Sequence, residues 1–241
     1  MTSTRSPRSD LPRRYSTPGF HRFVRGVSRL VLTCVAHLDV QGMEHIPSEG
    51  GFIGVINHLS SFDPLLVFAV MPVRPITMFA AREHRSDFIA GWALDRLGAI
   101  WIDREEPGRE ALRIALNELA LGTAFGIAPE GTRSKTGALL EGKTGAAYLA
   151  TRANVPILPV VVWGTEQIKH NLRRLKRTTV QMRMGALIYL PAGRADAEKL
   201  QEYTDMIMRK MASMLPPEYR GVYADLTPTP QPPTPLLGGE G

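Results

Sequence analysis

The stretch Phe52-Ile-Gly-Val-Ile-Asn-His-Leu-Ser-Ser-Phe-Asp-Pro64 joins a short apolar run to a polar turn and then to a proline. The apolar run predicts a buried strand over residues 52–57, and Pro64 suits the first position of a helix. Beyond it, short apolar runs alternate with helical stretches, which is typical of the crossover units of α/β proteins. We therefore expect a mixed, largely parallel central sheet flanked by helices.

The hydrophobic pattern on the C-terminal side of this stretch assigns the remaining elements. Further strands are predicted over residues 75–81, 99–104, 124–128, 157–163 and 179–189. Helices are predicted over residues 64–71, 86–97, 108–121, 143–153 and 196–214. Ser86 is the expected N-cap of one helix, and Asn154 is expected to end another.

The composition limits the classes of protein to which this chain can belong. Its 241 residues, of which 44% are apolar and 22% charged, suffice for one sizeable core. Cys34 is the single cysteine, which excludes a disulfide framework and a cysteine-based zinc site. No uncharged apolar run reaches the ~18 residues expected of a transmembrane helix.

The positive charge of the chain is concentrated at its N-terminal end. Residues 1–30 hold seven arginines and one acid, Asp10, whereas the rest of the chain has 22 basic and 22 acidic residues. A nucleic-acid-binding domain carries its basic residues on the folded body, so we expect no nucleic-acid partner. A basic end on a neutral body favours attraction to an anionic membrane surface.

Both ends of the chain have compositions that do not build a core. Residues 1–19 are rich in Ser, Pro and Arg and are predicted to be a disordered basic segment. They also resemble a transit peptide, although Asp10 and three prolines argue against that interpretation. Residues 216–241 contain seven of the 19 prolines and are predicted to form a flexible tail.

Residues 20–38 space their apolar side chains as a helix with one apolar stripe, and Arg22, Arg25 and Arg29 lie off that stripe. A basic amphipathic helix of this kind fits an interfacial, membrane-associating position. The alternative is a helix that covers the protein's own core. The placement of the arginines favours the membrane.

His58 and Asp63 are the first pair of residues that could carry chemistry. Five residues correspond to about 500° along a helix, so the two side chains meet only if the intervening residues turn back. Ser60 and Ser61 allow such a turn. Asp63 would then hold one ring nitrogen of His58, and the other nitrogen would act as a general base. The alternative is that Asp63 only caps a helix and that His58 is a loop residue.

A second candidate site is Pro129-Glu-Gly-Thr-Arg-Ser134, which directly follows a predicted strand. Ligands of α/β sheets usually bind where strands end. Thr132 offers a hydroxyl group, and Arg133 offers a planar guanidinium that suits a phosphate; the alternative is a solvated turn. Arg82 and Arg104 also fall at predicted strand ends, where they could converge on one anion or be ordinary surface charges.

Two further patterns carry less specific signals. Gly137-Ala-Leu-Leu-Glu-Gly-Lys-Thr144 matches the nucleotide P-loop pattern, but the required preceding strand is missing. A basic loop follows residue 168, which is either solvated or placed to meet a phosphorylated donor or lipid headgroups. Its basic residues are Lys169, Arg173, Arg174, Lys176 and Arg177.

The ordered set of motifs resembles the glycerolipid acyltransferase family that includes the 1-acylglycerol-3-phosphate acyltransferases. The matching blocks are N-H-x4-D at residues 57–63, G-x-I-x-[IV]-D-R at 98–104, P-E-G-T-R-S at 129–134 and V-P-[IL]-[IL]-P-V at 155–160. The P-loop lookalike falls on the family's F-K-x-G segment. Ala128 and Gly142 depart from the resemblance, because the family often has phenylalanine at both positions.

The resemblance implies a role for each matching residue. His58 would be the base and Asp63 its partner. The acceptor's phosphate would lie among Arg82, Arg104, Glu130, Gly131, Thr132 and Arg133. Because the carboxylate of Glu130 would repel a phosphate, we expect it to orient Arg133 or another basic residue.

The resemblance implies an acyltransferase domain over residues 39–215. It would move an acyl chain from coenzyme A or acyl carrier protein to a lysophospholipid, most simply 1-acylglycerol-3-phosphate, and needs no cofactor besides the thioester. Glycerol-3-phosphate or another lysolipid is an alternative acceptor. A P-loop nucleotide enzyme and a non-catalytic lipid-binding module are alternative functions. We expect a peripheral or monotopic protein on the cytoplasmic face of a membrane.

Overall fold

A computed structural model of the protein describes residues 18–72, 76–103 and 108–225. Its strands are β1 (Ala36–Gln41), β2 (Phe52–Ile56), β3 (Ile76–Ala81), β4 (Ile100–Ile102), β5 (Ala124–Ile127), β6 (Ile157–Trp163) and β7 (Thr178–Met184). Within these described residues they form one seven-stranded sheet in the order β1-β7-β6-β2-β5-β3-β4. The strands from β2 to β6 are parallel, β7 is antiparallel to β6, and β1 is parallel to β7. The predicted mixed, largely parallel sheet is therefore confirmed.

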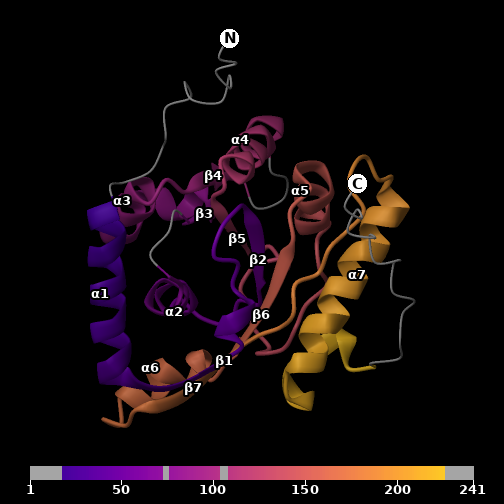
Figure 1. The fold of residues 1–241 in the computed structure, drawn as a ribbon. Helices are drawn as coiled ribbons and strands as arrows, with labels where there is room; N and C mark the ends of the chain where they lie inside the picture. Colours follow the sequence, from indigo (N-terminus) through magenta and orange to yellow (C-terminus); the bar gives the residue numbers. More distant parts are fainter. Residues whose placement is uncertain (1–17, 73–75, 104–107, 226–241) are drawn as a thin grey trace.

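Helices cover both faces of this sheet (Figure 1). They are α1 (Pro18–Val35), α2 (Asp63–Val70), α3 (Phe88–Arg96), α4 (Arg109–Ala120), α5 (Gly145–Ala153), α6 (Ile168–Leu172) and α7 (Ala197–Met214). Helices α1, α2 and α6 pack on one face, and α4, α5 and α7 pack on the other. This double cover explains why β6 reads Ile-Leu-Pro-Val-Val-Val-Trp, with six of its seven residues buried.

The strand and helix boundaries differ from the predicted ones mainly at polar ends. Strand β7 ends at Met184 rather than at residue 189, and α3 begins after Asp87 instead of Ser86. Residues 82–86, of which only Ser86 falls within the predicted helix, form a separate 3-10 turn. Asn154 ends α5 as expected, in the left-handed conformation with φ of 52°.

The N-terminal helix departs from its predicted range, because α1 ends at Val35 and the next residues form β1. Leu32 of α1 is completely buried in the core against α2, whereas Phe23 and Leu30 are 60% and 67% exposed. Helix α1 therefore covers the core with one face and presents apolar side chains on the other. The predicted disordered segment at residues 1–19 lies almost wholly outside the described residues.

The prediction of a flexible tail is wrong for residues 216–225. Residues 217–219 and 221–223 form two 3-10 turns. Tyr223 is buried in the same hydrophobic core as residues of α5 and α7, and Tyr219 packs against that core. The sequence pattern missed this because two tyrosines and short hydrogen-bonded turns supply the packing instead of a periodic apolar run. Residues 226–241, the rest of the predicted tail, lie outside the described residues.

Candidate active site

The candidate catalytic residues gather at one edge of the sheet. Strands β2, β5 and β6 are parallel, so their carboxyl ends meet at that edge. His58 follows β2, the turn at residues 128–134 follows β5, and Thr165 follows β6. The motifs that are far apart in the sequence are thereby brought into one site.

His58 and Asp63 form the predicted dyad. The Nδ1 atom of His58 lies 2.7 Å from the Oδ2 atom of Asp63, because residues 59–62 turn back before α2 begins. An ionised carboxylate only accepts hydrogen bonds, so Nδ1 carries the proton and Nε2 is left as the basic nitrogen. The His58 side chain is 27% exposed and that of Asp63 only 3%, so the imidazole is accessible from the cavity side while its partner is buried.

The carboxylate of Asp63 is fixed by further donors. The backbone N–H groups of Leu59 and Ser60 each donate to Oδ2 at 2.7 Å, and the hydroxyl of Thr165 donates to Oδ1 at 2.5 Å. Phe62, not Asp63, occupies the N-cap position of α2. Asp63 thus orients His58 rather than capping its helix, which settles the alternative that the spacing left open.

The carboxylate of Glu130 is held by two backbone N–H groups. Its Oε1 atom accepts the backbone N–H of His58 at 3.1 Å, and its Oε2 atom accepts that of Leu140 at 3.0 Å. The expectation that Glu130 orients a basic residue is therefore corrected: its side chain is buried and joins the His58 loop to the segment of residues 134–143, hereafter the strap. Burial raises the pKa of the Glu130 carboxyl, and the two amide donors oppose that rise.

The next three residues of this turn face the cavity beside His58. Gly131, Thr132 and Arg133 all contribute to its wall, and Thr132 and Arg133 are exposed. Gly131 has a φ of +68°, and a Cβ atom there would come within 3.0 Å of the Lys143 side chain. Lys143 therefore lies against this turn and adds a second cation to the same wall.

Of the two strand-end arginines, Arg82 lies within the described residues. Arg82 lies 3.4 Å from Asp103, with both side chains more than 60% exposed, and its neighbours Ala81 and His84 line the cavity in its place. Arg104 lies outside the described residues. The predicted convergence of these arginines on one anion stays a prediction.

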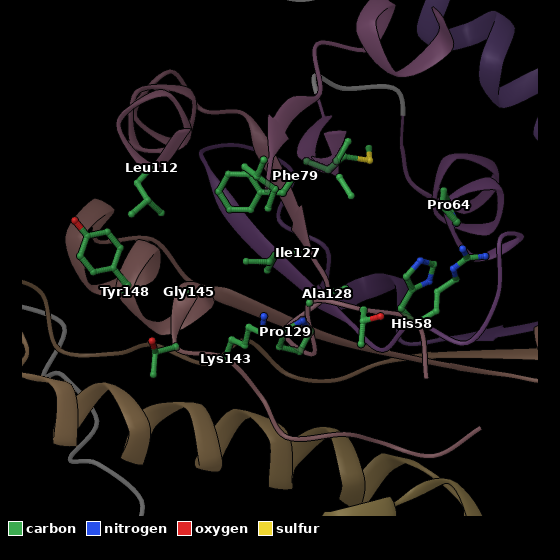
Figure 2. A pocket seen from close by; sticks show the side chains of 18 of the residues that line it. His58, Pro64, Phe79, Leu112, Ile127, Ala128, Pro129, Lys143, Gly145 and Tyr148 are labelled. Carbon is green, nitrogen blue, oxygen red and sulfur yellow. The ribbon is translucent and has the colours of Figure 1, made fainter. Parts of the chain in front are cut away.

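A cavity of about 540 Å³ extends from His58 into the molecule. Figure 2 shows His58 toward one end of it, Lys143 below its middle, and Leu112 and Tyr148 at the far end. Most of the remaining wall is apolar and comes from β3, β4, α4 and β5; it includes Met78, Phe79, Ile102, Leu112 and Ile127. The site therefore joins a base and two cations to an apolar chamber.

The strap contradicts the P-loop alternative. A P-loop holds phosphate with successive free backbone N–H groups. Here the N–H groups of Leu139, Leu140, Gly142 and Lys143 already donate to Tyr219, Glu130, Tyr223 and Pro129. Gly142 also has no room for the family's phenylalanine, since a Cβ atom there would lie 2.7 Å from Met208.

Residues 217–223, which follow α7, hold the strap in place through two hydrogen bonds. Leu139 donates to the backbone oxygen of Tyr219 at 2.9 Å, and Gly142 donates to the hydroxyl of Tyr223 at 3.0 Å. Through the strap this segment supports Lys143 and Glu130, and so the cavity wall and the His58 loop. The sequence analysis did not predict this support of the strap, the role of Thr165 or the supporting role of Glu130. For Thr165 the available signal was a polar residue just after an apolar strand.

Replacing Tyr223 with phenylalanine should lower kcat several-fold at temperatures where the protein is fully folded. The change removes the acceptor of the part-buried N–H of Gly142, at a cost of ~1–3 kcal/mol, so the neighbouring Lys143 should lose its fixed position. Tyr219→Phe is the matched control. The Tyr219 hydroxyl donates to Glu166, away from the strap, and burial with the Glu166 carboxylate raises its pKa to about 12.

Steady-state kinetics and thermal melting of both variants separate positioning from stability. Tyr219→Phe should lower only the melting temperature. Equal losses of kcat in the two variants would contradict a specific role of Tyr223.

Comparisons with known proteins agree with this geometry. A family model described as Acyltransferase matches residues 37–163, which is more than half of the chain. The 1-acyl-sn-glycerol-3-phosphate acyltransferase alpha of Homo sapiens is 35% identical over 145 residues, which cover 56% of this chain and 50% of that protein. This chain thus spans about half the length of its mammalian relatives.

Two bacterial proteins match over more of their length. The 1-acyl-sn-glycerol-3-phosphate acyltransferase of Bacillus subtilis is 26% identical over 157 residues, covering 65% of this chain and 77% of that protein. The crystal structure of the 1-acyl-sn-glycerophosphate (LPA) acyltransferase PlsC from Thermotoga maritima superimposes with a TM-score of 0.62 at 26% identity. That likeness covers 81% of this chain and 79% of the other.

Proposed function

Because the chain belongs to the Acyltransferase family, we propose that it moves a fatty acyl chain from an acyl thioester to the hydroxyl of a phosphorylated lysolipid. The acceptor that fits best is 1-acylglycerol-3-phosphate, which would give phosphatidate, since the named relatives are acyltransferases of that lipid. The observation that carries the proposal is the His58–Asp63 dyad at one end of an apolar cavity, beside Arg133 and Lys143.

The proposed reaction uses His58 as a general base. Its Nε2 atom takes the proton of the acceptor hydroxyl as that oxygen attacks the thioester carbonyl, and Asp63 stabilises the imidazolium that forms. When the carbon–sulfur bond breaks, the leaving thiolate takes the proton from the imidazolium. The products are an ester and a free thiol. A thioester is already activated, so a serine nucleophile and a resident cofactor have no part in this scheme.

The two substrates divide the site between them. The apolar part of the cavity, whose wall includes Phe79 and Leu112, suits an acyl chain, which gains ~0.8 kcal/mol for each buried methylene. Arg133 and Lys143 suit the acceptor's phosphate, with Gly131 and Thr132 offering close backbone approach and a hydroxyl. Coenzyme A and acyl carrier protein are the two candidate carriers of the donor.

Replacing Arg133 with lysine should raise the KM for 1-acylglycerol-3-phosphate about ten- to a hundredfold. Lysine keeps the charge but loses the planar pair of donors that meets a phosphate, at a cost of ~1.5–3 kcal/mol. The KM for the donor should change much less. Arg152→Lys, on an exposed position of α5, is the matched control.

An acceptor without the phosphate should react poorly with the wild type and show no further loss in Arg133→Lys. If the substitution raises only the KM of the donor, this wall binds the carrier of the thioester, and the acceptor is placed wrongly.

A membrane surface is the proposed place of action. The outer face of α1 presents Phe23, Val27 and Leu30 to solvent, as expected of a peripheral or monotopic interfacial helix. Of the three arginines that lie off the apolar stripe of this helix, Arg29 donates to the backbone oxygen of Ala69. Among residues 18–72, 76–103 and 108–225, no helix is long and apolar enough to cross a membrane. The cytoplasmic face stays a prediction.

A further inference from the structure

A second exposed basic surface lies outside the catalytic site, at residues 169–177, hereafter the basic turn. It comprises most of α6 and the turn that leads into β7. It has no acidic residue, and all five of its basic side chains are exposed: Lys169, Arg173, Arg174, Lys176 and Arg177. The dyad, the cavity and the strap make no use of these charges.

Leu175, at the tip of the basic turn, has a conformation and an exposure that are unusual for leucine. Its side chain is 93% exposed, and its φ is 52°, in the left-handed region. The N–H groups of Leu175 and Lys176 donate to the backbone oxygens of Leu172 and Asn171, which is the helix-ending pattern that ordinarily has glycine at this position. Branched residues adopt this conformation only at an energetic cost, so the exposed leucine requires an explanation outside the fold.

The basic turn adjoins the C-terminal end of α1. Ala36, which follows α1, pairs with Thr178, which follows the basic turn, and Arg177 donates to the backbone oxygen of Ala36. Figure 1 shows α6 beside the end of α1 that leads into β1. Leu172 and Leu175 of the basic turn are exposed, as are Phe23, Val27 and Leu30 of α1. Helix α1 and the basic turn together hold eight Lys and Arg residues and no carboxylate.

We propose that the basic turn binds the headgroups of an anionic lipid bilayer while Leu175 inserts into its interface. This inference rests on the proposed function only in that α1 would lie on the same membrane. Basic side chains interspersed with exposed leucines match a surface that is anionic outside and apolar beneath. The basic turn is a second contact with the bilayer, separated from the aromatic end of α1 by the length of that helix.

The test compares binding to vesicles of phosphatidylcholine with and without phosphatidylglycerol. Replacing Arg173, Arg174 and Lys176 with glutamine should weaken binding to the anionic vesicles about a hundredfold at low salt, since each basic residue contributes about fivefold. Arg177 is left in place because it supports β1. The matched control replaces Arg194, Lys199 and Lys210 with glutamine. These residues are exposed in and near α7, on the other face of the sheet, and the control should bind the vesicles like the wild type.

Leu175→Gly tests the tip without endangering the fold, because glycine adopts the left-handed conformation readily. The variant should melt no earlier than the wild type, yet bind anionic vesicles about tenfold more weakly. Unchanged vesicle binding by both this variant and the triple glutamine variant would overturn the proposal.

Two further outcomes are informative. If vesicle binding is unchanged but turnover with an acyl carrier protein donor falls in the triple glutamine variant, the basic turn docks an acidic protein and the proposal is wrong. Acyl transfer to a detergent-dispersed acceptor should be unaffected by either variant. Its absence in the wild type would count against the proposed function, while the vesicle measurements would still decide the role of the basic turn.

Discussion

The kcat of the variant His58→Ala should fall by about two to four orders of magnitude, and the variant should keep its fold. The loss follows from removing the general base, whose contribution is typically ~10²–10⁴-fold. The fold should survive because the backbone N–H and oxygen of His58, which bond to Glu130 and Ser134, are unchanged. Single-turnover kinetics with a saturating acceptor measures the chemical step directly.

His84→Ala is the matched control for that measurement. His84 lines the same cavity, but its ring nitrogen Nδ1 lies 3.1 Å from the carboxylate of Asp87 and is not part of the His58–Asp63 dyad. Its substitution should leave kcat close to the wild-type value. Near-normal turnover in His58→Ala, or equal losses in the two variants, would remove His58 from the mechanism.

The second large effect is expected for Asp63→Asn, with kcat falling about a hundredfold or more. Three N–H donors surround the Oδ2 atom of Asp63, so the amide oxygen of asparagine should take that place. The hydroxyls of Ser60 and Thr165 near Oδ1 can rotate to accept from the new amide nitrogen. The tautomer of His58 is then preserved, and the loss is that of the negative charge that stabilises the imidazolium, worth ~1.5–3 kcal/mol or more.

Thr165→Val separates the charge of Asp63 from its packing. This substitution removes one hydroxyl donor to Asp63 but keeps the carboxylate, so kcat should fall only several-fold. A loss in Thr165→Val as large as that in Asp63→Asn would mean that the orientation of Asp63, not its charge, limits the reaction.

The sequence was sufficient for six of the seven strands and for the dyad, because these depend on local patterns. The apolar run at residues 52–57 and the serines after it encode a strand and a tight return, which bring His58 onto Asp63. Glu130 was misplaced for the opposite reason. Its partners, the N–H groups of His58 and Leu140, come from distant parts of the chain, and only their packing shows that the carboxylate is buried.

The ends of the domain were harder to predict than its centre. Residues 36–38 continue the helical spacing of α1, yet they pair with β7 as an edge strand, because a sheet partner 142 positions away overrides local propensity. The packing of Tyr219 and Tyr223 on the strap likewise depends on single long-range hydrogen bonds. Such contacts leave no periodic signal in a short proline-containing segment.

The central claim is acyl transfer to a phosphorylated lysolipid, and one assay of the purified full chain tests it most directly. Wild type and His58→Ala would be given a labelled acyl thioester, on coenzyme A and on acyl carrier protein, with 1-acylglycerol-3-phosphate, glycerol-3-phosphate or a lysolipid lacking the phosphate monoester. We predict that the wild type forms labelled phosphatidate from 1-acylglycerol-3-phosphate with at least one donor, and that His58→Ala does not. Binding of that lipid without any transfer, or transfer that is equal in the two proteins, would contradict the account.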